Sequence, residues 1–130
     1  MGMFQIRARV ANVFDTGRFF DDAFWVDTGA MYTFVPEPWL RRIGVEPAGN
    51  REFVYADGRI ETRPVGDASF RIEGYDETRP CPVVFAPNDS LFLLGATALE
   101  IFGLDVDASH KALKRTAAIV GGHLTLRPRP

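Results

Sequence analysis

The stretch that decides the fold is AFWVDTGAMYTF, residues 23–34. Its first four residues are apolar and rich in β-forming side chains, which predicts a strand buried on both faces. The strand ends at Asp27, and an ionised acid in an apolar setting is costly unless it is paired or changes its protonation. Gly29 permits a tight turn and a close approach of a ligand, and Thr28 can brace that turn by hydrogen bonding. The stretch therefore indicates a carboxylate that a turn presents for chemistry.

The same tripeptide, Asp-Thr-Gly, also occurs at residues 15–17 within NVFDTGRFF. No buried run precedes Asp15, and Arg18 follows the tripeptide directly. Small polar residues and glycine between apolar flanks are typical of a surface turn. We therefore interpret Asp15 as a turn acid and Asp27 as the functional one.

Length and composition indicate one globular domain over residues 1–130. The chain is 46% hydrophobic and 25% charged, with a formal net charge of -2, which argues against nucleic acid as a partner. Residues 109–130 carry five lysines or arginines and no acid, and we expect them to form a solvated basic extension.

Localisation signals are missing from the sequence. The first ten residues lack the apolar core of a signal peptide, and the longest apolar run, residues 91–104, is too short to cross a bilayer. The only cysteine is Cys81, so no internal disulfide can form. We expect a cytoplasmic protein without a membrane partner.

The rest of the chain reads as short strands and turns. Residues 5–14 alternate apolar and polar side chains, and Asp57-Gly58 lies between apolar flanks as a two-residue hairpin signal. Further strand candidates are residues 67–74, 79–86 and 90–94, a short helical turn is expected before Gly44, and residues 96–103 form the best helix. The pattern predicts an all-β fold, a small barrel or sandwich with one short helix near its C-terminal side.

The sequence does not supply the residues that most catalytic mechanisms require. The two histidines, His110 and His123, lie in or beside the basic extension, and Cys81 stands between two prolines without a nearby histidine. These residues support neither a Ser-His nor a Cys-His mechanism, nor a zinc site. Asp105 and Asp107 are interpreted as water-facing residues, and we expect no metal and no cofactor.

Asp27 remains, and one acid alone does little for amide hydrolysis. Two acids that share one proton can do both halves of that reaction, because one activates water and the other protonates the carbonyl. A two-fold symmetric dimer would bring together Asp27 of two copies.

The segment FWVDTGAMYTFVP resembles the active-site signature of the retroviral-like aspartic proteases. A second family mark is LFLLGATALEIFGLDVD, in which Gly95 follows apolar residues and opens a C-terminal helix. The hairpin around Asp57-Gly58 lies between them, where the family keeps a flap over its substrate. The likeness spans roughly residues 5–107. It implies a small closed β-barrel of the retropepsin type and a homodimeric aspartic endopeptidase that acts on polypeptides.

The resemblance also assigns roles to residues. Asp27 is the expected catalytic acid, with one copy from each subunit. The expected supporting residues are Thr28, Gly29, Ala30 and Gly95, and the expected flap residues are Tyr55, Ala56, Asp57 and Gly58. The chain departs from viral members at Met31 and Ala96, which stand where those members carry a paired acid and arginine.

Two other readings stay open from the sequence. The fold could be a catalytically inactive binding or dimerisation module, with Asp27 as a structural acid. The chain could also be an unrelated small β-barrel that binds an apolar ligand, which would fit its 12% aromatic residues.

Overall fold

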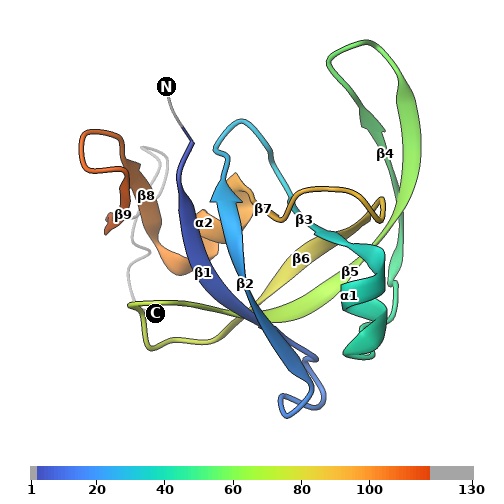
Figure 1. Ribbon diagram of the computed structural model, residues 1–130, viewed down its shortest axis with the longest axis horizontal. Coiled ribbons are helices and arrows are strands. Elements are labelled where there is room, and N and C mark those ends of the chain that lie inside the picture. The colour runs from blue at the N-terminus through green and yellow to red at the C-terminus, as the bar shows by residue number, and fades with distance from the viewer. Residues whose placement is uncertain (1–2, 118–130) are drawn as a thin grey trace, which may run out of the picture.

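The computed structural model describes residues 3–117, which form a mostly β structure (Figure 1). The strands are β1 (Gln5–Ala11), β2 (Phe19–Val26), β3 (Thr33–Pro36), β4 (Gly49–Val54), β5 (Ile60–Ile72), β6 (Arg79–Ala86), β7 (Leu93–Leu94), β8 (Leu104–Asp107) and β9 (Ala112–Arg115). The helices are α1 (Glu37–Arg42) and α2 (Ala96–Phe102). Within residues 3–117, no helix has both the length and the hydropathy needed to cross a membrane.

Seven strands form one sheet in the order β1-β2-β7-β3-β6-β5-β4, and β1 also pairs with β5. The pairing therefore runs from β1 through five neighbours back to β1, and β4 is attached outside this circuit, to β5 alone. In Figure 1 the β4–β5 hairpin projects beyond the other strands, toward the same end as the loop after β2. Strands β8 and β9 form a separate two-stranded sheet.

The core is built from the inward faces of these strands and from α2. Phe24 of β2 contacts Phe70 of β5 and Phe92 edge-on, with ring centroids 6.2 Å and 5.4 Å apart. Full burial of one phenylalanine side chain contributes about 1.5–3 kcal/mol to the stability of the fold. Further fully buried large side chains are Phe85, Phe102, Leu40, Ile72 and Leu94. This packing fixes the end of β2, where Asp27 follows.

The C-terminal helix is confirmed where the sequence predicts it. Helix α2 buries Leu99 and Phe102 on one face, and Gly103 ends it in the left-handed conformation, at φ +65°. The helical turn before Gly44 is a full helix, α1, so the described part of the chain holds two short helices and not one.

Strand β5 is longer than the sequence predicts. The sequence predicts a hairpin around Asp57-Gly58 and a separate strand over residues 67–74, but β5 runs unbroken from Ile60 to Ile72. Gly66 in its middle lets the chain after α1 pass closely, since a β-carbon there would lie 2.8 Å from the Glu46 carbonyl oxygen. The glycine marks this crossing and no break in the strand.

The basic extension is partly folded. The expectation that residues 109–130 form a solvated tail is wrong for β9, which pairs with β8. The Arg115 guanidinium donates to Glu77 over 2.7 Å and to the Phe102 carbonyl oxygen over 3.1 Å. The sequence also allows a strand over HLTL, residues 123–126, but this segment, with His123, lies outside the described residues.

Candidate active site

Asp27 is the first residue after β2, and hydrogen bonds hold it on both sides. Its N–H donates to the Leu94 carbonyl oxygen over 3.0 Å. Its Oδ1 accepts from the N–H of Gly29 at 3.0 Å, and its carbonyl oxygen accepts from the N–H of Ala30 at 3.2 Å. The side chain is half-buried, and Oδ2 has no hydrogen-bond partner within residues 3–117. The turn therefore presents one free carboxylate oxygen from a fixed backbone.

The loop that carries Asp27 rests on the start of α2 at Gly95. A β-carbon at position 95 would overlap the Tyr32 carbonyl group and lie 2.9 Å from the Ala30 carbonyl oxygen. The N–H of Gly95 donates to the buried Thr33 hydroxyl over 3.1 Å. The N–H of Ala96 donates to Ala30 over 2.8 Å. Only glycine allows this approach, so the structure brings the two sequence marks together.

The positions of Met31 and Ala96 are linked through the backbone. The Met31 carbonyl oxygen accepts from the N–H of Thr97 at 3.0 Å, beside the Ala30–Ala96 bond. The Met31 side chain is 63% exposed. Backbone hydrogen bonds therefore fasten the loop to the helix at the place where viral members use an ion pair.

Thr28 points away from the core and is exposed. It lines a cavity of about 640 Å³ between the Asp27 loop, α2 and the ends of the β8–β9 sheet. Ala96 and Leu99 form part of its wall. A surface that adjoins the Asp27 turn is thus open in the single chain.

The second Asp-Thr-Gly adopts the same local turn. Asp15 Oδ1 accepts from the N–H of Gly17 at 3.2 Å, and the Asp15 carbonyl oxygen accepts from the N–H of Arg18 at 3.0 Å. Asp15 is exposed and precedes β2, whereas Asp27 follows it. The tripeptide alone therefore specifies the turn, and tertiary placement separates the two acids.

The predicted flap is the β4–β5 hairpin. Its tip contains Tyr55, Ala56, Asp57 and Gly58, of which Tyr55 is half-buried and the others are exposed. The Tyr55 carbonyl oxygen accepts from the N–H of Gly58 at 2.9 Å, and the N–H of Tyr55 donates to Arg59 over 2.8 Å. Gly58 has φ +84°, so the tip is a three-residue connection with a left-handed glycine and not the expected two-residue turn.

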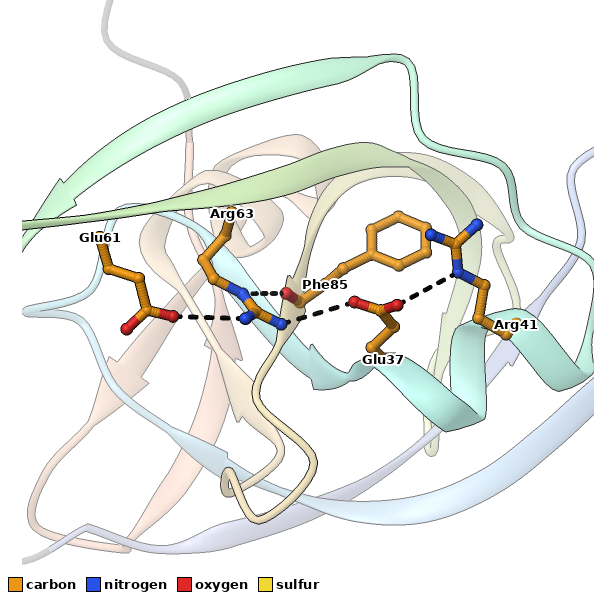
Figure 2. A network of polar contacts seen from close by, with 5 residues as sticks. All are labelled: Glu37, Arg41, Glu61, Arg63 and Phe85. Atoms are coloured by element: carbon orange, nitrogen blue, oxygen red, sulfur yellow. Dashed lines mark hydrogen bonds and ion pairs between the residues drawn. The ribbon is translucent and has the colours of Figure 1, made fainter.

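A polar network attaches the root of the flap to the body (Figure 2). Arg63 of β5 donates through Nε to the Phe85 carbonyl oxygen over 2.8 Å. Its two terminal nitrogens lie 3.3 Å from Glu61 and 3.5 Å from Glu37 of α1. Glu37 in turn contacts Arg41 at 3.4 Å. The Arg63 side chain is only 20% exposed, so these contacts are partly shielded from water.

Sequence reasoning missed Arg63 and also an aromatic group that includes Tyr32 of the Asp27 loop. Phe53 of β4 contacts Tyr32 and Phe34, which follow Asp27 along the chain. Phe53 and Phe34 lie on strands and Tyr32 lies in the loop before β3, and nothing in the sequence pairs β4 with the Asp27 loop. Their contact follows from the long reach of the hairpin.

Other reactive groups within the described residues do not form a site. Burial raises the pKa of the Cys81 thiol to about 12, so the thiol is protonated at neutral pH. His110 Nδ1 lies 2.7 Å from Asp107 and 3.2 Å from the Ser109 hydroxyl, so Asp107 and Ser109 contact the same ring nitrogen in an exposed turn. No group of three potential metal ligands occurs within residues 3–117.

Comparisons with known proteins give one family match and a structural match. A family model described as aspartyl protease matches residues 11–106. Among solved structures, the chain is similar to a retropepsin-like aspartic protease from Rickettsia conorii, with 22% sequence identity and a TM-score of 0.48. That match covers 82% of this chain and 86% of the other. The search of curated proteins found no match. Since the family match extends over most of its length, the chain belongs to the aspartyl protease family.

Proposed function

We propose that the protein is a homodimeric aspartic endopeptidase of the retropepsin type, with Asp27 of each subunit as the catalytic acid. The observation that carries the proposal is the Asp27 turn, which holds one carboxylate oxygen against Gly29 and leaves the other free. Family membership supports the chemistry, and the circuit of pairing from β1 back to β1 supports the closed β-barrel. The buried free thiol of Cys81 fits a reducing, cytoplasmic location.

In the proposed reaction, a water molecule lies between two Asp27 carboxyl groups that share one proton. The ionised group takes a proton from water as the water oxygen attacks the peptide carbonyl carbon. The protonated group gives its proton to the carbonyl oxygen. In the collapse of the tetrahedral intermediate, the ionised carboxylate takes a proton from one of its hydroxyl groups as the C–N bond breaks, and the protonated carboxyl group gives its proton to the leaving nitrogen. The proton count is restored after each turnover, so no cofactor is required.

A dimer is needed because each chain supplies one such acid. Asp15 is separated from Asp27 by the full length of β2 and does not serve as the second. We place the partner on the side of Thr28, where the open cavity adjoins the catalytic turn. The partner's Asp27 then reaches the free oxygen of the first across the two-fold axis.

Of the two other functions that the sequence left open, one remains. Membership of the aspartyl protease family sets aside the unrelated barrel that binds an apolar ligand. A catalytically inactive dimerisation module is the competing function, and it predicts the same fold without hydrolysis.

The test is hydrolysis of fluorescently labelled casein, an unstructured polypeptide, by purified protein. Asp27→Asn should lower kcat by at least about 10²-fold, because an amide cannot take or give the shared proton. Asp15→Asn is the matched control, since it alters the same tripeptide in the same local turn, and it should retain wild-type activity. Casein cleavage that survives in Asp27→Asn would exclude the dyad, and intact casein with folded dimeric wild-type protein would favour the inactive module.

A further inference from the structure

Three aromatic rings join the flap to the Asp27 loop. The Phe53 ring in β4 meets the Tyr32 ring edge-on, with centroids 6.0 Å apart and planes at 88°. It also meets the Phe34 ring at the start of β3, with centroids 5.5 Å apart and planes at 62°. Edge-to-face contacts at this distance are favourable beyond the apolar area that they bury. The cluster therefore holds two segments together that share no strand pairing.

Tyr32 is a fixed platform for this contact. Its carbonyl group lies directly over Gly95, where a side chain would collide with it. The Arg51 guanidinium covers its ring at 5.2 Å from the centroid, a cation–π distance. Tyr32 is five residues beyond Asp27 on the same anchored loop, so a group that docks on its ring is placed relative to the catalytic carboxylate.

The flap has few other attachments. Strand β4 is an edge strand that pairs with β5 alone. Cross-strand register places Phe53 opposite Glu61 and Arg51 opposite Arg63, so all four side chains lie on one face of the hairpin. Within the described residues, that face meets the body at the Arg63 network near the root and, through Arg51 and Phe53, at the Tyr32 ring. Phe53 makes two of these contacts, with Tyr32 and with Phe34, so the position of the outer strand depends on it more than on Arg51.

We propose that Phe53 is a positioning residue, which docks the flap on the Tyr32 platform and so sets its height over Asp27. This inference rests on the proposed endopeptidase function for its catalytic consequence. Docking would hold the flap near its working position before a polypeptide arrives. Less ordering would then be needed on binding, which favours tighter binding of the substrate. Loss of the ring should therefore raise KM more than it lowers kcat.

The first measurement reads docking without activity. Amide hydrogen exchange of residues 49–60 should be about tenfold faster in Phe53→Ala than in wild type, since two aromatic contacts are lost. Val54→Ala is the matched control, because Val54 is 72% exposed on the opposite face of the same strand. Phe53→Tyr keeps the ring and should restore wild-type exchange. Equal exchange in Phe53→Ala and Val54→Ala would overturn the inference.

The second measurement uses casein hydrolysis by the same four proteins. Phe53→Ala should raise KM by roughly five- to tenfold with kcat changed by less than about threefold, while Val54→Ala and Phe53→Tyr stay within twofold. An unchanged KM in Phe53→Ala would overturn the positioning role. If no protein cleaves casein but exchange still rises in Phe53→Ala alone, the endopeptidase proposal fails while docking of the flap is supported.

Discussion

Gly95 and Tyr32 bring the Asp27 loop and the start of α2 together: the Tyr32 carbonyl group occupies the space where a side chain at position 95 would be. The contact is between backbone groups, so neither side can move away by changing a rotamer. It joins the loop after β2 to the beginning of α2, and the Asp27 turn depends on it. The absence of a side chain at position 95 therefore helps to determine where the Asp27 carboxylate lies.

Gly95→Ala should destabilise the protein by about 1–3 kcal/mol, because the new methyl group must push the loop away from α2. Hydrolysis should be lost in parallel, since Asp27 moves with the loop. Gly49→Ala is the matched control: a β-carbon there meets nothing within 4 Å, and its unfolding free energy should stay within about 0.5 kcal/mol of wild type. Urea unfolding of wild type and the two variants measures the change in stability, and casein hydrolysis measures the loss of activity. A Gly95→Ala protein as stable as Gly49→Ala would show that the loop yields freely.

Arg63→Met should cost about 1–3 kcal/mol in unfolding free energy, because the Phe85 carbonyl oxygen loses its side-chain donor and Glu37 and Glu61 lose their shared cation. Arg59→Met removes another arginine from the same hairpin. Its pair with Asp57 is exposed, at 64% and 65%, so its loss should change stability by less than about 0.5 kcal/mol. Urea midpoints compare the two variants. Equal losses would mean that burial of the network contributes nothing.

A ninefold excess of Asp27→Asn over wild type should reduce casein hydrolysis by roughly tenfold once subunits have exchanged. Each wild-type chain then meets an inactive partner in about nine of ten dimers, and a mixed dimer lacks one acid. The same excess of Asp15→Asn, which keeps the catalytic acid, should raise total activity instead. Activity that is indifferent to the excess of Asp27→Asn would show that one chain holds a complete site.

The Cys81 thiol should make stability fall at alkaline pH. Burial raises its pKa in the folded protein to about 12, against 9.0 for an unburied thiol, so the unfolded chain ionises first and stability decreases as pH rises above about 9. Between pH 8 and 10, wild type should lose about 1 kcal/mol more than Cys81→Ala does. Urea unfolding at the two pH values gives this difference. An identical pH dependence of the two proteins would show that the thiol ionises equally in both states.

The sequence predicts the parts of the fold that local patterns encode. Strand β2, the hairpin and α2 each carry their own signals, in apolar runs, in Asp57-Gly58 and in the terminal Gly103. Strand β3 was hidden because Pro36 follows a run of only three strand residues. Strand β9 was hidden because its charged side chains resemble a solvated tail, and only pairing with β8 orders them.

The candidate site divides in the same way. The Asp27 turn can be predicted because the hydrogen bond that forms it lies within Asp-Thr-Gly, as the same turn at Asp15 shows. The contacts of Phe53 and Arg63 could not be predicted from the sequence, since their partners come from distant segments. Phe85 is 22 residues from Arg63, and neither position carries a pattern that names the other. Contacts of this kind depend on how far a hairpin reaches, which local sequence does not state.

Strand β5 serves two parts of the molecule without a break: residues 60–65 form the flap stem, and residues 66–72 belong to the core. Side chains along it alternate faces with a period of two, so core and flap share one phase. A single inserted residue between them would turn Glu61 and Arg63 to the outer face and carry Ile60 inward. An engineered insertion between the two parts of β5 must therefore contain an even number of residues if both faces are to be kept.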